Sequence, residues 1–192
     1  MKLIKDIALI SLLGLIITNY SNASDMYIGV GGGFGNNSGV GKLYAGAGIS
    51  QYFALEGDYE VWGSSQYTTN LYNGVTNSSY QYTVNPQSLD LLLVGKLQLG
   101  ASPISIHAKL GGAYVFVNSS NISSQGASYG TNSGGFTAVG GLGAGLDVGK
   151  SIRIDIDWIN YGFIQPVGIT SSIGDVGTFS TNNYELGISY NF

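Results

Sequence analysis

The most reactive side chains of the chain are few, and two of them sit close together. His107 is the only histidine and cysteine is absent, so chemistry that needs an imidazole base depends on His107. Ser105 lies two residues before it, and a serine, a histidine and an acid are the parts of a hydrolytic triad. His107 lies near the start of a predicted strand, shortly after a tight turn, and this places it near one rim of the fold. We interpret it as a structural, hydrogen-bonded histidine, and we predict no catalytic residues and no enzyme activity.

Two carboxylates, Asp155 and Asp157, follow Arg153 at alternate positions. Alternate residues of a strand share one face and lie about 7 Å apart, so this pair could bind a metal or form ion pairs. The neighbouring Arg153 favours ion pairs, and we predict no metal site and no cofactor. The glycine-rich run at 29–33 is not interpreted as a phosphate-binding loop, because no helix is predicted after it.

The composition limits the class of protein. Only 9% of the 192 residues are charged, 44% are hydrophobic, and glycine contributes 31 residues. The absence of cysteine excludes a disulfide scaffold and a thiolate metal site, and the acidic balance excludes a basic nucleic-acid binder. A soluble surface normally carries roughly 25–35% charged residues. Much of this surface therefore need not face water.

The first residues have the pattern of a secretory signal peptide. Lys2 and Lys5 precede an apolar run over 7–17, and small residues at 21–23 supply a cleavage site. The apolar run is too short for a membrane anchor, which needs about 20 residues. We predict a signal peptide over 1–23, cleaved during export, and a single domain over 24–192.

Alternating apolar and polar residues predict strands in the rest of the chain. In the last one, Tyr184, Leu186 and Ile188 share a face opposite Glu185 and Gly187. The predicted strands are 26–34, 42–50, 53–62, 88–99, 104–117, 135–148, 151–162 and 183–192.

Nearly every charge within these strands falls on one face, and the other face is apolar. A barrel in water would turn its apolar face inward, and a barrel in a membrane would turn it outward. The scarcity of charge and the many glycines on the polar face favour the membrane form. Aromatic residues near strand ends are typical of interfacial girdles. They are Phe34, Tyr52, Phe53, Trp62, Phe136, Trp158, Tyr184 and Phe192.

The connections alternate in length, as is typical of outer-membrane barrels. The short turns are 51–52, 100–103 and 149–150, and the longer loops are roughly 35–41, 63–87, 118–134 and 163–182. We predict an all-β, eight-stranded, antiparallel, up-and-down transmembrane β-barrel. Both termini are expected on the side of the short turns, and the protein is expected to be a monomer.

The chain resembles the transmembrane domain of the OmpA-like outer-membrane proteins over essentially all of 24–192. The segments that carry the resemblance are 26–29, 55–59, 108–112, 152–158 and 186–192. The resemblance implies an outer-membrane location in a Gram-negative bacterium. It also implies that the terminal Phe192, with Tyr190 before it, is an assembly signal. The chain stops at Phe192, so the peptidoglycan-binding domain of larger members, and a tether to the cell wall, are not expected.

The polar face predicts an interior salt-bridge network, because buried charges must be paired. Its members are Glu56, Lys96, Lys109, Arg153, Asp155 and Asp157. Glu56 and Lys96 each lie three residues from the short-turn end of neighbouring strands, so we expect them to pair. The resemblance implies that Glu56, Lys96 and Arg153 match a network proposed as a gate in that family. Gly143 stands where that network has another acid, and we predict a static, stabilising network.

These features predict a structural role in envelope integrity and surface display. The alternative is an adhesin or immune-interaction protein that binds a host surface ligand through the long loops, and a small pore ranks below both. The expected partners are outer-membrane lipids, lipopolysaccharide, the outer-membrane assembly machinery and periplasmic chaperones. No nucleic-acid partner is expected.

Overall fold

The computed structural model describes residues 26–35, 38–72, 77–123, 128–164 and 179–192. Its elements are β1 (Met26–Gly35), β2 (Gly39–Gly48), β3 (Phe53–Trp62), β4 (Ser65–Tyr72), β5 (Asn77–Gln98), β6 (Ile104–Ser123), β7 (Ser128–Val148), β8 (Ile152–Ile164) and β9 (Phe179–Asn191). No helix long and apolar enough to cross a membrane lies among these residues. The predicted signal peptide, 1–23, falls outside them.

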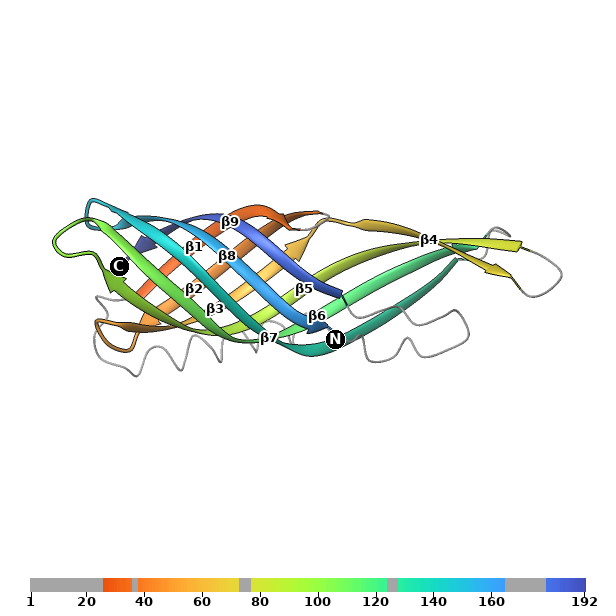
Figure 1. Cartoon of the computed structure of the whole chain (residues 1–192), viewed down its shortest axis with the longest axis horizontal. Coiled ribbons are helices and arrows are strands. Elements are labelled where there is room, and N and C mark those ends of the chain that lie inside the picture. The colour runs from red at the N-terminus through yellow and green to blue at the C-terminus, as the bar shows by residue number, and fades with distance from the viewer. Residues whose placement is uncertain (1–25, 36–37, 73–76, 124–127, 165–178) are drawn as a thin grey trace.

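The sheet closes on itself through antiparallel pairs. β1 pairs with β2 on one side and with β9 on the other, and β3 pairs with β5, which joins the two ends of the strand order. β4 continues the path of β3 after a break at Gly63 and Ser64. The result is a closed eight-stranded barrel with its strands in chain order, so the predicted fold is confirmed (Figure 1).

Three tight connections lie at one end of the barrel, together with the C-terminus (Figure 1, left). They join β2 to β3, β5 to β6, and β7 to β8, as the sequence predicts. Gly100 and Gly149 adopt φ values of 64° and 74°, a left-handed conformation that glycine enters without steric cost. We call this end of the barrel the short-turn end.

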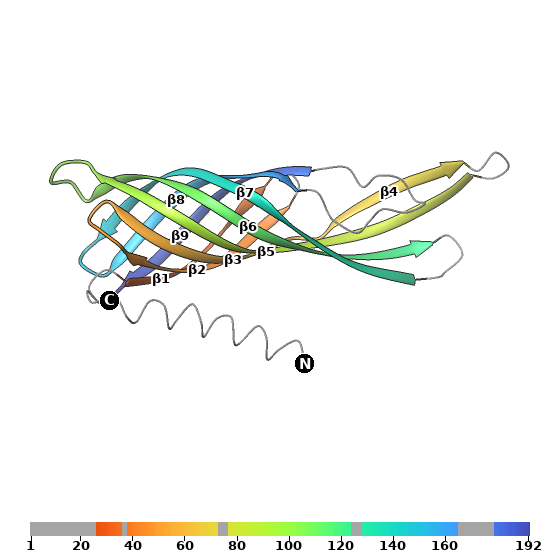
Figure 2. The same cartoon turned by 90° about the horizontal axis from the view of Figure 1, so that it is seen from below.

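The opposite end differs from the prediction, because much of the predicted loops 63–87 and 118–134 is strand. β4 pairs with β5 from Ser65↔Val84 to Tyr72↔Asn77, and β5 pairs with β6 as far as Tyr80↔Ser123. β7 continues the ladder along β6 to Ser128. We call these parts of β4, β5, β6 and β7 the extension; it projects well beyond the closed barrel (Figures 1 and 2).

The other two predicted loops have different outcomes. The turn between β1 and β2 is shorter than 35–41, because β2 begins at Gly39 and the Gly35 N–H donates to the Ser38 carbonyl at 2.8 Å. In the predicted loop 163–182, β8 reaches Ile164 and β9 begins at Phe179, and 165–178 lie outside the described residues.

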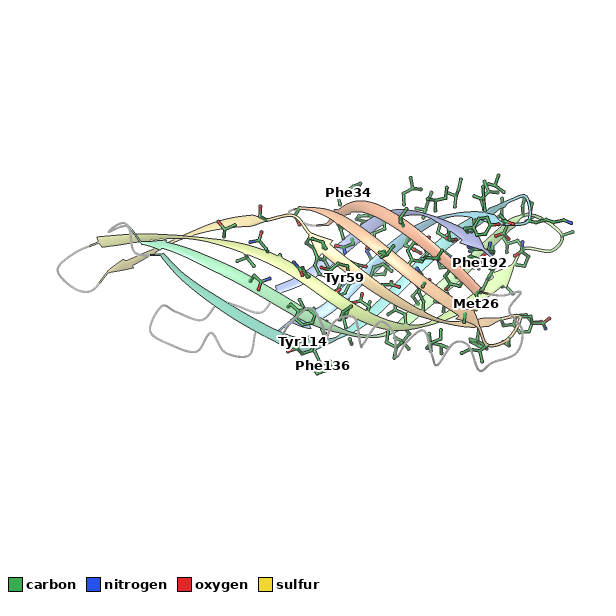
Figure 3. The ribbon with its side chains drawn as sticks, turned by 180° about the vertical axis from the view of Figure 1, so that it is seen from behind. Met26, Phe34, Tyr59, Tyr114, Phe136 and Phe192 are labelled. Carbon is green, nitrogen blue, oxygen red and sulfur yellow. The ribbon has the colours of Figure 1, made fainter. Side chains whose placement is uncertain are left out.

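The two faces of the barrel wall separate apolar and charged side chains as predicted. On β3, Leu55 and Tyr59 are exposed, whereas Glu56 and Asp58 are buried. Aromatic side chains mark two levels along the barrel: Phe34, Tyr59, Tyr114 and Phe136 lie near the extension, and Phe192 lies near the short-turn end (Figure 3).

Trp62 is an exception to the predicted girdle. Its ring is buried inside the barrel, where it packs against Tyr161 with ring centroids 5.1 Å apart. Trp62 shares the inward face of β3 with Glu56, Asp58 and Glu60, so strand parity places it in the lumen although it stands at a strand end.

Candidate functional site: the charged lumen

Arg153 on β8 organises the charges nearest the short-turn end. Its Nε donates to Asp155 Oδ1 at 2.7 Å, and its Nη1 lies 3.1 Å from Asp147 Oδ1. Its Nη2 donates to Ser105 Oγ at 2.9 Å. The guanidinium therefore binds two carboxylates and one hydroxyl, which fits its planar set of donors.

Lys96 joins this group from β5, but it does not pair with Glu56 as expected. Its Nζ lies 3.8 Å from Asp147 Oδ2, and its side chain is 39% exposed. In the β3–β5 register Glu56 faces Leu92, and the Lys96 N–H instead donates to the Tyr52 carbonyl. The strands of a closed barrel are staggered, so residues equally far from the ends of neighbouring strands are not partners.

Lys109 holds the next level of the lumen. Its Nζ donates to Glu56 Oε1 at 2.8 Å and to Asp157 Oδ2 at 2.9 Å, and all three side chains are buried. The Tyr27 hydroxyl donates to the other oxygen of Glu56 at 2.8 Å. Burial makes such a pair sensitive to the loss of either partner, because the remaining charge would stay buried and uncompensated.

His107 takes part in the same network. Its Nε2 contacts Asp157 Oδ1 at 2.5 Å, and its Nδ1 lies 3.3 Å from Arg153 Nη2. Ser105 Oγ accepts its hydrogen bond from Arg153, so the chain from serine to histidine to acid that a triad requires is not formed by these residues. Asp155 binds the neighbouring Arg153, whereas the partners of Asp157 are Lys109 and His107 on β6.

Gly143 provides the space for the His107–Asp157 contact. A Cβ atom at this position would overlap Asp157 Oδ1, His107 Nε2 and the Ile156 carbonyl. The side chain of an acid could not fit there without displacing one of them. The close packing of His107 against Asp157 therefore depends on a glycine at position 143.

A fourth cation, Lys42, belongs to the lumen but is not among the residues predicted from the sequence. Its Nζ lies 3.3 Å from Asp58 Oδ2 and 3.1 Å from Glu185 Oε2, and all three residues are buried. The predicted second strand begins at Lys42 itself, so the alternation pattern does not show whether the Lys42 side chain points into the lumen or outward. Extending the alternation back to Val40, with Leu43 outward, would have placed Lys42 in the lumen.

Three carboxylates, Asp58, Glu60 and Asp90, form a tight group beside Lys42, which stands opposite Glu60 in the β2–β3 register; we call it the carboxylate cluster. One oxygen from each lies within 4.8 Å of the others, and all three are buried. The Tyr161 hydroxyl donates to Asp90 Oδ2, and Asn183 Nδ2 donates to Glu60 Oε2 at 3.3 Å. Asp58 Oδ1, Glu60 Oε1 and Asp90 Oδ1 have no hydrogen-bond partner among the described residues.

Apolar side chains fill the lumen around and beyond the cluster. Trp62 donates from Nε1 to Asn183 Oδ1 at 3.3 Å, which ties this apolar layer to the polar groups. The other members of this apolar cluster are Val40, Val84, Leu92, Ala113, Val115, Val117, Val139, Ile159 and Tyr161. At the short-turn end, by contrast, a cavity of about 380 Å³ reaches Lys96, Lys109 and Arg153.

The predicted assembly residues lie on the outer face at the short-turn end. Tyr190 and Phe192 are both exposed, and their ring centroids are 5.4 Å apart. The Phe192 N–H donates to the Met26 carbonyl at 2.9 Å, so the last residue completes the seam between β9 and β1. This geometry leaves both rings available on the outside of the barrel.

Comparisons with known proteins agree on the fold. No family model and no curated protein matches the sequence. A major outer membrane protein from Thermus thermophilus superposes with a TM-score of 0.61 at 12% identity, covering 89% of this chain and 100% of that one. The N-terminal β-barrel domain of Pseudomonas aeruginosa OprF gives 0.54 at 11% identity, covering 88% and 98%. Neisserial surface protein A gives 0.51 at 11% identity, covering 89% and 98%. At these identities the similarity concerns the fold alone.

Proposed function

We propose that the chain is an integral outer-membrane protein of OmpA-like form, exported by a cleaved signal peptide, whose role is structural. The main support is the orientation of the side chains in the barrel wall. Apolar side chains face outward and charged side chains face inward, the reverse of a barrel in water. Leu110 is 69% exposed and Ile156 is 64% exposed, whereas their neighbours Lys109 and Asp157 are buried. Such a surface is favourable in lipid, and a closed barrel leaves no unpaired strand edge there.

The contents of the lumen support a stiffening role rather than a conducting one. Lys42, Lys109 and Arg153 each bind two carboxylates, and apolar side chains fill the level of Trp62. A gate would need a second set of partners for these charges. Glu56 is bound by Lys109 and Tyr27 from two different strands, which favours one fixed arrangement.

The partners follow from this placement. Outer-membrane lipids and lipopolysaccharide would contact the apolar face, and periplasmic chaperones and the assembly machinery would handle the chain before insertion. Tyr190 and Phe192 would serve as the signal that this machinery reads. No catalytic role is proposed, because His107 and Ser105 are both held by the salt-bridge network.

Cell fractionation tests the placement. The protein should be recovered in the outer membrane, and the extracted form should migrate differently on gels before and after heating, as folded barrels do. Loss of the gene should make cells more sensitive to detergent, and expression of the protein should restore resistance. Recovery of a folded, soluble protein from the periplasm would overturn the proposal.

A second candidate function, binding to a host surface, is favoured by the extension. Residues 61–89 and 110–146 contain no charged side chain, yet the ladders of β4, β5, β6 and β7 continue through them beyond the barrel. Natural sheet edges are commonly protected by charge or proline. The long, uncharged edges of β4 and β7 would suit contact with another surface.

Register-matched deletions separate the two candidates. Removing 66–83 would join the partners Ser65 and Val84, and removing 119–131 would join Asn118 and Asn132, each through an Asn-Gly turn. The shortened barrel should still insert and restore detergent resistance. If the protein is an adhesin, binding to host cells should be lost with the extension; binding that persists would contradict that role.

A further inference from the structure

We propose that the carboxylate cluster is a binding site for a divalent cation, with Ca²⁺ as the best-fitting ion. The site would consist of Asp58, Glu60 and Asp90 together with Ser88. It lies inside the closed barrel, at the level of Lys42, which stands opposite Glu60 in the β2–β3 register.

The register places these four residues as a square on the inward faces of β3 and β5. Asp58 faces Asp90, and Glu60 faces Ser88. Directly opposed side chains on one face lie about 4.5–5.5 Å apart, and like charges in this relation are destabilising. An opposed pair of aspartates inside a barrel is therefore stabilised by a nearby cation or by a proton on one of them.

Ser88 is a separate observation that indicates a ligand. It is 0% exposed, and its hydroxyl has no hydrogen-bond partner among the described residues. It stands opposite Glu60 and two residues before Asp90 on the same inward face of β5. A buried hydroxyl without a partner is costly, and coordination of an ion would satisfy it.

The protein's own cations do not neutralise all the negative charge of the carboxylate cluster. Lys42 lies next to the cluster, but it divides its charge between Asp58 Oδ2 and Glu185 Oε2. Asp58 Oδ1, Glu60 Oε1, Asp90 Oδ1 and Ser88 Oγ remain without partners among the described residues. Lys42 also stands opposite Glu60 in the β2–β3 register, so this one lysine is shared among several acids, and a divalent ion would supply the rest of the positive charge.

The donor set selects the class of ion. All four donors are hard oxygens, and neither cysteine nor histidine belongs to the cluster, which disfavours soft transition metals. Ca²⁺ accepts six to eight oxygens in irregular geometry, whereas Mg²⁺ requires a near-ideal octahedron. Carboxylates on two neighbouring strands with a serine hydroxyl, completed by buried water, suit Ca²⁺.

The test is the stability and ion content of the full barrel. The protein is refolded in detergent micelles with Ca²⁺ or with a chelator, because the site is enclosed. Folding is verified by gel migration before and after heating. Ca²⁺ should raise the unfolding temperature of the wild type, since an ion that binds only the folded state stabilises it. An unfolding temperature and an ion content that do not respond to Ca²⁺ would overturn the proposal, because the cluster would then hold protons instead.

Isosteric variants assign the site. Glu60→Gln and Asp90→Asn should each abolish the Ca²⁺-dependent shift, and in chelator Glu60→Gln should unfold at a higher temperature than the wild type because one opposed charge is gone. Asp147→Asn is the matched control: its carboxylate binds Arg153 at the short-turn end, so the shift should persist. A shift that survives in both cluster variants would place the ion elsewhere and contradict the proposal.

Terbium luminescence gives a second readout. Trp62 binds Asn183, which in turn binds Glu60, so Tb³⁺ in the cluster should be sensitised by excitation of tryptophan. Trp62→Phe should lose this emission and keep the Ca²⁺ shift, whereas Trp158→Phe should keep both. Glu60→Gln should weaken Tb³⁺ binding by more than about tenfold, as loss of metal-site groups commonly does. Emission that depends on Trp158 would locate the ion outside the lumen.

Discussion

At the scale of single residues, the lumen is a set of cations that each bind two acids. Lys42 connects β3 and β9, and Lys109 connects β3 and β8, so removing one lysine affects three strands. Lys96 differs, because its side chain is partly exposed and has one partner at 3.8 Å. Burial and the number of partners, rather than charge alone, should decide which lysine matters.

In the presence of a chelator, Lys42→Met should lower the free energy of unfolding by about 3–5 kcal/mol, because it leaves Asp58 and Glu185 buried without a cation. Lys96→Met should cost less than about 1 kcal/mol, as expected for an exposed pair. Urea unfolding of the refolded protein measures both values. Equal costs for the two variants would mean that the buried network does not stabilise the barrel.

Gly143→Ala tests the crowding around His107 and Asp157. The added methyl group must displace one of them, which should cost about 1–3 kcal/mol, as overpacking usually does. Gly140→Ala on the same strand is the control, because nothing lies within 4 Å of its added Cβ. The same unfolding measurement applies, and a neutral Gly143→Ala would show that the lumen can rearrange.

At the scale of the elements, the sequence predicts the strands and turns that an alternating pattern or a glycine marks. It does not predict the strand pairing of the extension or the stagger between strands, which no such pattern marks. Leu55 and Glu56 alternate clearly because one faces outward and the other faces the lumen. The tight turns at Gly100 and Gly149 are equally visible, since glycine marks them. The extension lacks this signal: its Ser, Thr, Asn and Tyr residues do not alternate with charge, and its pairing depends on backbone hydrogen bonds. The partner of Lys96 depends on the stagger between strands, which no local pattern encodes.

The C-terminal strand carries a prediction about assembly. Phe192→Ala should reduce the amount of protein inserted in cells, because the proposed signal is lost, while refolding of the purified protein into micelles should be nearly unchanged. Tyr184→Ala removes another exposed aromatic of β9 and serves as the control. Immunoblots of outer-membrane fractions measure insertion. Equal insertion of both variants would argue against a specific role for Phe192.

The two ends of the strands should lie on opposite sides of the membrane. An epitope inserted between Tyr72 and Asn77, beyond the β4–β5 hairpin strands, should bind antibody on intact cells. An epitope inserted after Gly149, in the short turn between β7 and β8, should bind only after the outer membrane is permeabilised. The reverse labelling pattern would invert the proposed orientation.

At the scale of the whole molecule, low charge and the closed sheet have one explanation. The charged side chains of the strands lie mainly inside, where they bind one another, and the apolar side chains form the outer surface. An exposed apolar surface of this kind is favourable in lipid, and we expect the uncharged but polar extension to face water. The outer face of the barrel is therefore expected to contact lipid.

The two tryptophans allow the contact of each face with lipid to be measured directly. Trp158 is on the outer face and Trp62 is buried in the lumen. The barrel is reconstituted in bilayers containing brominated lipids, and tryptophan fluorescence is recorded for Trp62→Phe, which retains Trp158, and for Trp158→Phe, which retains Trp62. The bromines should quench Trp158 strongly and Trp62 much less. Equal quenching of both, or none of Trp158, would contradict the placement of the outer face in lipid.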